Sequence, residues 1–376
     1  MKKIILSVFV LFLLIPIKVK ANNLCSGAKS AILINSSDGE ILYEYEKDLK
    51  CAPASMTKIM TLLLIYDNIN AGNLKKEDMI GVSEYAKGMG GSQVFLDTRE
   101  KLSVDDMLKC ICIASANDAA VAMAEHIYGS EAMFVEKMNE RAKGLGCSNT
   151  NFLDCTGLSD NDHYSSAYDM AKISQELIVK YPDVLNYTSI KEDYIRKDTD
   201  NPFWLVNTNK TLGHVEGMLG LKTGYTNKAG YCITLVQKKD DLALISVVMG
   251  YTDKTKRNAE SIGLLNYGFS NYKNELVIKE NEIVAKINDI KYNPSTLNII
   301  TKENVYILRK KADNYKYNIK YAYNVNDNNL NSSVGKAYIY DNEDNLIKEV
   351  DLYLSCSVKR NSLFNIIRIL IGGLFK

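Results

Sequence analysis

Residues 52–61 read APASMTKIMT, and the apolar run TLLLIY (61–66) continues without a break. Within this stretch Ser55 stands three positions before Lys58, shortly after a proline. The segment Met56 to Ile65 is apolar on every face of a helix, which predicts a helix buried at the centre of a domain. Taken alone, the pattern favours a capped core helix, because serine is a common cap and a nearby lysine is usually solvated.

The same pair of residues also has a chemical interpretation. Ser55 and Lys58 are one helical turn apart, so their side chains share a face. Burial disfavours a charged ammonium and lowers its pKa, which allows a lysine to act as a base near neutral pH. A serine beside such a base is an activated nucleophile, and the N-terminus of a helix favours the oxyanion that forms there. The rest of the chain decides between cap and nucleophile.

The pattern around this helix predicts an α/β (α+β) domain. Ser103, with Asp106 three residues later, starts a helix with a capping box, and Gly129 ends a second helix as a C′ glycine. Strands at both ends of the region, with helices between them, indicate one mostly antiparallel sheet packed against a helical cluster. The expected elements are a hairpin over 30–48, helices over 118–128, 166–180 and 255–269, and strands over 220–226, 229–240 and 241–251.

Two short motifs join Ser-x-x-Lys farther along the chain. Ser115-Ala116-Asn117 lies at a break between predicted helices, and Lys222-Thr223-Gly224 lies on a predicted strand. Ser-x-x-Lys, Ser-x-Asn and Lys-Thr-Gly, in this order, form the motif set of penicillin-binding proteins and serine β-lactamases. Each tripeptide is common by chance, but the three together in these structural settings are specific.

The chain most resembles the low-molecular-mass D-alanyl-D-alanine carboxypeptidases, peptidase family S11, over roughly residues 28 to 272. The segments similar to that family's motif blocks are PASMTKIMT (53–61), SANDAAVAMAE (115–125), FLDCTGLSD (152–160), SSAYDMAKIS (165–174) and GLKTGYTNKAGYC (220–232). Two departures stand out. Asp154-Cys155 replaces a frequent Asn-Pro, and Ser-Ala-Asn replaces Ser-Gly-Asn. The resemblance implies a β-lactamase/transpeptidase-like fold, and neither departure removes a reacting group.

The resemblance also implies catalytic roles. Ser55 attacks the carbonyl between two terminal D-alanines of a peptidoglycan stem peptide, which gives an acyl-enzyme and releases D-alanine. Lys58 takes the proton of Ser55, and Ser115 relays a proton to the leaving amine. Asn117 orients Lys58 and the substrate amide. β-Lactams are expected to acylate Ser55 as covalent inhibitors.

Substrate-binding roles follow from the same resemblance. Lys222 and Thr223 are expected to bind the terminal carboxylate, and Gly224 to let the substrate backbone approach the strand, where a side chain would obstruct it. The backbone N–H groups of Ser55 and Tyr225 are expected to form the oxyanion hole. Weaker candidates for carboxylate recognition are Thr226 and Arg257.

The two ends of the chain predict export and attachment to a membrane surface. Residues 1–21 read as a secretory signal peptide cut after Ala21, rather than an anchor, because the apolar run from Ile4 to Ile17 is short. After a catalytic domain over 22–272, residues 276–355 alternate as a small all-β domain. Residues 357–376 predict an amphipathic helix in the interface of an anionic leaflet, or else a helix packed on the protein's own surface. The protein is therefore expected at the outer face of the cytoplasmic membrane or in the cell wall.

Composition excludes several other functions. The formal net charge of +1 gives no electrostatic footprint for nucleic acid. Three scattered histidines and no Cys-x-x-Cys motif argue against a metal site, and no cofactor is expected. Among the eight cysteines, the spacing leaves a Cys147–Cys155 pair open.

Two alternative functions remain. A class A β-lactamase has the same motifs but also needs a glutamate that activates the deacylating water, and the chain contains no Glu-x-x-Leu-Asn. We therefore expect inhibition by penicillin rather than its rapid hydrolysis. The second alternative is a catalytically silent wall-binding protein that keeps the fold.

Overall fold

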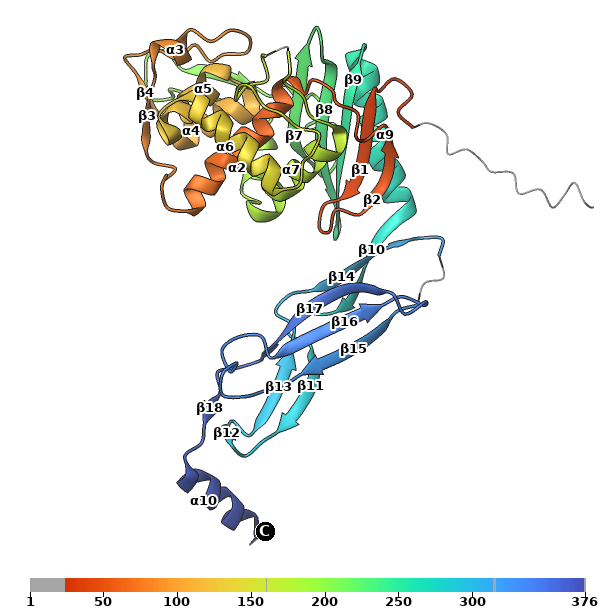
Figure 1. Cartoon of the computed structure of the whole chain (residues 1–376). Coiled ribbons are helices and arrows are strands. Elements are labelled where there is room, and N and C mark those ends of the chain that lie inside the picture. The colour runs from red at the N-terminus through yellow and green to blue at the C-terminus, as the bar shows by residue number, and fades with distance from the viewer. Residues whose placement is uncertain (1–23, 160, 314–315, 375–376) are drawn as a thin grey trace, which may run out of the picture. The chain divides into compact units, whose positions relative to one another are not determined.

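A computed structural model describes residues 24–159, 161–313 and 316–374, so the predicted signal peptide lies outside the described residues. The chain separates into two compact units, Met1–Gly268 and Phe269–Lys376 (Figure 1). We call them unit 1 and unit 2 and describe each by itself.

The centre of unit 1 is an antiparallel five-stranded sheet with the strand order β2-β1-β9-β8-β7. The outer strand β2 and the strand β1 form the hairpin predicted about Asp38-Gly39. The bounds are β1 Ser30–Asn35, β2 Ile41–Tyr45, β7 Met218–Thr226, β8 Gly230–Lys239 and β9 Leu242–Tyr251. Since β1 pairs with β9, the N-terminal hairpin completes a sheet whose other strands come from the end of the unit.

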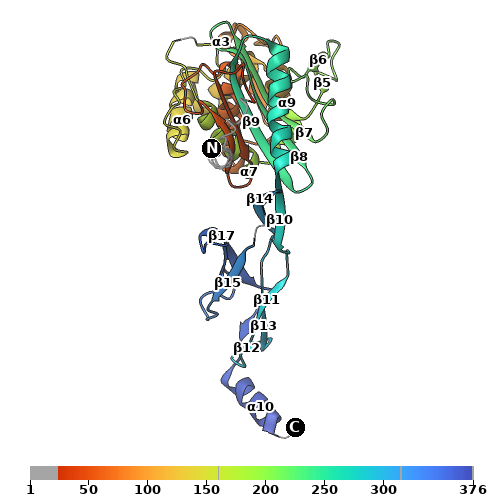
Figure 2. The ribbon, with the colours of Figure 1, turned by 90° about the vertical axis from the view of Figure 1, so that its right-hand side faces the viewer.

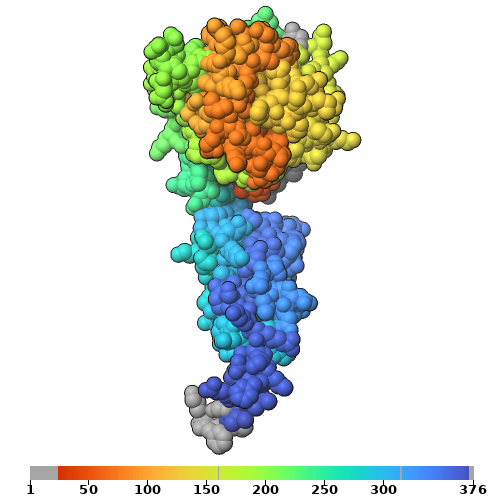
Figure 3. Space-filling view, turned by 90° about the vertical axis from the view of Figure 1, so that its left-hand side faces the viewer, coloured from red at the N-terminus to blue at the C-terminus, as the bar shows by residue number. Residues whose placement is uncertain are grey.

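Helices cover both faces of this sheet. Figure 2 shows α9 (Lys254–Asn271) across one face, where a side chain at Gly268 would meet Leu244 and Leu33. The other helices of unit 1 lie on the opposite face, and Figure 3 shows segments between β2 and α7, in orange to yellow, at the surface of unit 1. Their bounds are α2 Lys58–Asn70, α3 Glu84–Lys87, α4 Val104–Lys109, α5 Asn117–Tyr128, α6 Glu131–Gly144, α7 Ala167–Lys180 and α8 Val184–Thr188. Two small two-stranded sheets pair β3 (Met79–Gly81) with β4 (Lys101–Ser103), and β5 (Glu192–Ile195) with β6 (Phe203–Val206).

Local sequence signals explain several helix ends. The side chains of Ser103 and Ser166 accept hydrogen bonds from the backbone N–H groups three residues later, as N-caps do. Gly129 ends α5 in the left-handed conformation with φ 82°. The segment from Ser103, expected as one helix, changes after α4 into a π-helix, η2 (Cys110–Ala114). Single π-turns inside helices occur frequently at functional sites.

The helix α2 is buried on all sides over most of its length, as predicted. Its start differs from the prediction, because Ala54–Thr57 forms a separate 3₁₀ turn, η1, and α2 begins only at Lys58. The hydroxyl of Ser55 makes no capping hydrogen bond in this turn. The capped-helix interpretation of Ser55 is therefore wrong, and another role is needed for its side chain.

Over its described residues, unit 2 is all-β apart from one helix. Its larger sheet has the strand order β11-β13-β17-β16-β15, with a core that includes Ile299, Ile339 and Leu352. The bounds are β11 Ile283–Asn288, β13 Thr296–Ile300, β15 Asn318–Tyr323, β16 Gly335–Tyr340 and β17 Leu346–Leu354. Two further pairs are β10 (Tyr272–Ile278) with β14 (Val305–Lys310) and β12 (Tyr292–Asn293) with β18 (Lys359–Arg360). The mixed α/β class with antiparallel sheets and a second all-β unit is confirmed.

The helix α10 (Leu363–Leu374) follows the last strand of unit 2. Most of its described apolar side chains stand in solvent, with Leu363 exposed by 74% and Phe364 by 75%. Over the described residues, no helix combines the length and the apolar content needed to cross a membrane.

Candidate active site

A cavity of about 310 Å³ in unit 1 brings residues of all three sequence motifs together. Its wall is formed by η1, the residue after η2, strand β7 and the start of α9. The lining residues are Ser55, Ser92, Ser115, Thr208, Thr223, Gly224, Tyr225, Tyr231, Lys254 and Arg257. Of the residues predicted from the sequence, Lys58, Asn117 and Lys222 lie buried beside this cavity rather than in its wall.

The turn that carries Ser55 is held in a strained conformation. Ala54 adopts φ +49°, in the left-handed region that costs a non-glycine residue about 1–2 kcal/mol. The backbone of Gly157 packs against this turn so closely that a Cβ there would lie 1.9 Å from the carbonyl oxygen of Ala54. Such strain persists only where surrounding contacts impose it, and it is typical of functional sites.

Lys58 is fully buried directly behind Ser55. Its Nζ donates hydrogen bonds to Ser55 Oγ at 3.1 Å, to Asn117 Oδ1 at 2.5 Å and to the carbonyl oxygen of Thr156 at 2.9 Å. Burial lowers the pKa of Lys58 to about 8, although nearby Cys155, Asp154 and Asp118 act to raise it. A neutral amine keeps two of the three hydrogen bonds as donor, so the acceptors on Asn117 and Thr156 leave its lone pair facing Ser55.

Asn117 has a fixed orientation. Its Nδ2 donates to the carbonyl oxygen of Gly90 at 2.7 Å, and its backbone N–H donates to the carbonyl oxygen of Ser92 at 2.7 Å. These contacts place the donor end of the amide against the 90–92 loop, which leaves Oδ1 facing Lys58. The chain thus uses a neutral acceptor to orient the buried lysine.

Ser115 ends η2 in the left-handed conformation with φ 62°, which turns its hydroxyl toward β7. Lys222 Nζ donates to Ser115 Oγ at 2.8 Å and to the carbonyl oxygen of Thr223 at 3.2 Å. Burial and the charge of Lys58 lower the pKa of Lys222 to about 7. Lys58 and Lys222 are thus two buried amines with pKa values near neutrality, each bonded to a serine hydroxyl, and such groups can take up and return protons.

Strand β7 forms the remaining wall. It is the outermost strand of its sheet, so one edge of its backbone is open to pair with an extended ligand. The hydroxyl of Thr223 donates to Thr208 Oγ1 at 2.8 Å. Gly224 faces the turn of Ser55, because a Cβ there would lie 2.6 Å from the carbonyl oxygen of Pro53. The glycine therefore permits close packing of β7 on that turn, a reason that differs from the predicted approach of the substrate.

Arg257 is buried at the far end of the cavity. Its Nη1 donates to the carbonyl oxygen of Cys232 at 2.9 Å, and its Nη2 donates to Asn258 Oδ1 at 2.7 Å. Burial lowers the pKa of Arg257 to about 10. Since these acceptors are uncharged, the guanidinium remains an anchor for an anion that enters the cavity.

Tyr225 and Thr226 complete β7 with different contacts. The ring of Tyr225 stacks on that of Tyr231, with centroids 4.4 Å apart, at the rim of the cavity. Thr226 Oγ1 instead accepts a hydrogen bond from the backbone N–H of Ala229 and stabilises the β7–β8 turn. Thr226 is not among the described residues that line the cavity, so the structure does not bring it together with the other candidates.

The sequence motifs missed several groups at this site. Ser92, Thr208, Tyr231 and Lys254 line the cavity from outside the three motifs. For Ser92, the glycine-rich stretch around it was the available signal. The carbonyl oxygen of Thr156 contacts Lys58 with a backbone atom, which no residue type announces.

Over the part of unit 1 that the structure describes, the cysteines and metal-ligating residues show no second site. Cys147 and Cys155 both carry free thiols, so the pairing that the sequence left open is not formed. In the part of the chain that the structure describes, no cluster of histidine, cysteine and acidic side chains could hold a metal ion.

Comparison with known proteins relates both units to known families. Residues 18–253 match the family model of D-alanyl-D-alanine carboxypeptidase, and residues 272–360 match that of the penicillin-binding protein 5 C-terminal domain. D-alanyl-D-alanine carboxypeptidase DacF of Bacillus subtilis is 46% identical over 294 residues, 78% of this chain and 75% of that relative. Penicillin-binding protein 5 of Haemophilus influenzae superposes with a TM-score of 0.70 at 28% identity, covering 89% of this chain and 98% of that one. The ampicillin-bound form of penicillin-binding protein D2 of Listeria monocytogenes gives a TM-score of 0.58 at 30% identity, over 65% and 98% of the chains.

Proposed function

This chain belongs to the D-alanyl-D-alanine carboxypeptidase family, and from this premise we propose roles for the motif residues and for Arg257 at the cavity. The protein is a serine-type carboxypeptidase that removes the terminal D-alanine from peptidoglycan stem peptides. The observation that carries the assignment of its nucleophile is the 3.1 Å contact between Ser55 Oγ and the buried Nζ of Lys58. Among the described residues, Lys58 is the hydrogen-bond partner of the hydroxyl of Ser55, which caps no helix.

In the first step Ser55 Oγ attacks the carbonyl carbon between the two D-alanines while its proton passes to the neutral amine of Lys58. The backbone N–H groups of Ser55 and Tyr225 hold the oxyanion. As the C–N bond breaks, Ser115 relays the proton that Lys58 took from Ser55 to the departing amine, so Lys58 returns to its neutral form. Lys58 then takes a proton from the water that attacks the ester and returns it to Ser55 Oγ, and the shortened peptide leaves.

The terminal carboxylate of the substrate is proposed to lie between Thr223, Lys222 and Arg257. Arg257 supplies a charge that has only uncharged acceptors among its described contacts, and the hydroxyl of Thr223, which donates to Thr208 Oγ1 in this structure, is proposed to turn its proton to the carboxylate. The open edge of β7 orients the peptide backbone. We leave Thr226 out of the binding site because its hydroxyl serves the β7–β8 turn.

The experiment is release of D-alanine from a pentapeptide ending in D-Ala-D-Ala, compared between the wild type and Ser55→Ala. The wild type is expected to release D-alanine and the variant to lose that activity. Mass spectrometry after incubation with penicillin should find one adduct on Ser55. A folded wild type without an adduct would contradict the nucleophile and favour the silent wall-binding alternative.

The β-lactamase alternative predicts fast hydrolysis of the acyl-enzyme. The described residues that line the cavity include no carboxylate that could activate the deacylating water. We therefore propose that a penicillin adduct is long-lived. Rapid turnover of nitrocefin by the purified protein would contradict this.

Attachment to a membrane is proposed for α10. Its exposed apolar side chains, with Lys359, Arg360 and Arg368 nearby, suit the interface of an anionic bilayer. We propose that residues 1–21 direct export, that 22–272 form the catalytic domain and that 276–355 form a non-catalytic β domain before the anchor at 357–376. Deletion of residues 363–376 should abolish sedimentation with phosphatidylglycerol vesicles, and unchanged sedimentation would refute the anchor.

A further inference from the structure

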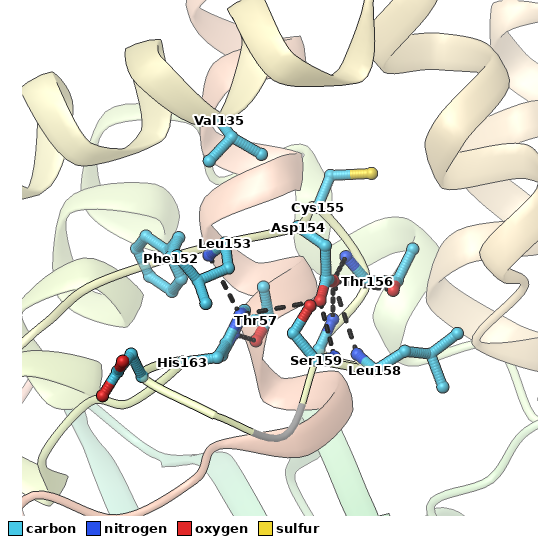
Figure 4. Close-up of polar contacts among 12 residues, drawn as sticks. Thr57, Val135, Phe152, Leu153, Asp154, Cys155, Thr156, Leu158, Ser159 and His163 are labelled. Carbon is cyan, nitrogen blue, oxygen red and sulfur yellow. Dashed lines mark hydrogen bonds and ion pairs between the residues drawn. The ribbon is translucent and has the colours of Figure 1, made fainter.

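The loop that follows α6 contains a buried aspartate beside the active site. Figure 4 shows Asp154 at the centre of polar contacts within the 152–159 segment. Its Oδ1 accepts hydrogen bonds from the backbone N–H of Thr156 at 2.7 Å, from the Thr156 hydroxyl at 2.8 Å and from the backbone N–H of Gly157. Its Oδ2 accepts from the backbone N–H of Ser159 at 2.7 Å. One carboxylate thus organises the loop.

The peptide unit between Thr156 and Gly157 joins this carboxylate to the catalytic lysine. Its N–H group donates to Asp154 Oδ1, and its carbonyl oxygen accepts from Lys58 Nζ at 2.9 Å. Donor and acceptor of one trans peptide point in opposite directions, so the unit lies between an anion and an amine. Hydrogen bonds in such a chain polarise one another, which makes the carbonyl a better acceptor for Lys58.

A second contact fastens the same loop to the turn of the nucleophile. His163 Nδ1 accepts from the backbone N–H of Leu153 at 3.1 Å, so the ring is neutral and Nε2 carries the proton. Nε2–H therefore donates to Thr57 Oγ1 at 2.8 Å, and Thr57 lies between Ser55 and Lys58 in sequence. Consistently, burial lowers the pKa of His163 despite the charge of Asp154. The loop is held from both sides, and its position relative to Lys58 is fixed.

We propose that Asp154 is a positioning residue for Lys58, which it holds through the Thr156–Gly157 peptide and whose protonation equilibrium it sets with its negative charge. The inference rests on the proposed function and deepens it. Asp154 would thus have two tasks, to hold the loop by hydrogen bonds and to act on Lys58 by its charge. The substitution Asp154→Asn distinguishes them, because it keeps an oxygen for the bonds at Oδ1 but removes the charge.

Among the described residues, Asp154 is one of four titratable groups whose charge can affect the protonation of Lys58. The titratable groups that face Lys58 are Asp154 and Cys155 from the loop, Asp118 from α5 and Lys222 from β7. Burial raises the pKa of Asp154, but the hydrogen bonds from Ser159 and Thr156 outweigh this effect and hold the pKa well below its usual range. Asp154 is therefore ionised at neutral pH and favours the ammonium form of Lys58.

The test is the rate of Ser55 acylation by a fluorescent penicillin between pH 5.5 and 10, measured on the full chain by stopped flow. Removing a negative charge disfavours the ammonium, so Asp154→Asn should move the acid limb about 0.5 to 1 pH unit lower. At pH 6 the variant should then be acylated about 3 to 10 times faster, relative to its own plateau, than the wild type. Asp154→Ala, which also frees the loop, should lower the plateau more than tenfold.

Asp169→Asn is the matched control. Asp169 is also buried and also holds a loop, by accepting hydrogen bonds from the Asn149 backbone N–H and the Thr150 hydroxyl, but it is not among the charges that act on Lys58. Its acid limb should coincide with that of the wild type. Thermal melting identifies any variant that fails to fold. If Asp154→Ala fails to fold, the acid limb of Asp154→Asn still tests the electrostatic role of Asp154.

Each outcome has one meaning. If the wild type is acylated and Asp154→Asn has the wild-type profile, or if Asp169→Asn shifts equally, the inference is overturned. A folded Asp154→Ala with the wild-type plateau overturns the positioning role. If the wild type itself is not acylated at Ser55, the proposed function fails before the inference is tested.

Discussion

Replacement of Gly224 by alanine tests whether β7 must lie against the turn of the nucleophile. The new Cβ would stand 2.6 Å from the carbonyl oxygen of Pro53, 3.2 Å from the Cβ of Ala54 and 3.3 Å from the backbone nitrogen of Met56. All three atoms belong to the segment that carries Ser55. The backbone of Gly224 itself needs no special conformation, since its φ lies outside the left-handed region. Any effect is therefore steric.

The magnitude follows from these distances. Carbon and oxygen atoms in close contact lie about 3.3 Å apart, so the strand and the turn must separate by roughly 0.7 Å, the difference between 3.3 and 2.6 Å. Because both partners are backbone, the cost is that of overpacking a core, about 1–3 kcal/mol in the free energy of unfolding. A misplacement of this size at reacting groups can lower a rate about 100-fold. The separation acts directly on the distance between the N–H groups of Ser55 and Tyr225.

Two measurements check this prediction, the midpoint of urea unfolding and the rate of acylation by penicillin. Gly263→Ala in α9 is the control, because a Cβ there meets nothing within 4 Å. That exposed helical site should gain about 0.5–1 kcal/mol with an unchanged acylation rate. If Gly224→Ala is as stable as the wild type and is acylated at the same rate, the reasoning from close packing is refuted.

Three further predictions concern charge, recognition and the second unit. With the pKa of Lys58 at about 8, its neutral fraction rises about tenfold between pH 7 and pH 9, so the acylation rate should rise likewise, and a flat profile would exclude Lys58 as the base. Arg257→Gln should raise KM for the pentapeptide about 10- to 100-fold through the loss of a charge-assisted contact, measured by D-alanine release, and an unchanged KM would remove Arg257 from the carboxylate site. Leu352→Ala in the core of unit 2 should cost about 2–4 kcal/mol in unfolding yet leave the acylation rate unchanged, and a parallel loss of acylation would contradict a non-catalytic unit 2.

Much of the fold was predictable because its signals are local. The caps at Ser103 and Ser166, the glycine that ends α5 and the apolar runs of β8 and β9 lie within or next to the elements they define. The π-helix before Ser115 was not predictable, since a helical pattern continues through it. Tertiary contacts, such as the hydrogen bond from the Thr208 backbone N–H to the carbonyl oxygen of Ile113, lie next to this irregular turn.

The candidate site divides in the same way. The residues with reactive side chains could be named because the three motifs contain them. The contacts that orient these side chains could not be predicted, because they involve atoms far away in the sequence. Lys58, for example, donates to the carbonyl oxygen of Thr156, which lies 98 positions later. Gly224 shows the limit clearly, because the motif marks the glycine while only the fold shows that its missing side chain faces Pro53.

The pairing of β1 with β9 has a consequence for how the chain folds after synthesis. Ser30 is opposite Met249 and Asn35 is opposite Leu244, so the central sheet joins residues at nearly the two extremes of unit 1. The chain loses the entropy of closing this long loop before the β1–β9 contacts stabilise it, so such topologies fold slowly. A chain that emerges N-terminus first thus presents β1 long before its second partner, β9, exists. Until β9 appears, the apolar β1 strand remains an open edge that needs protection from other chains.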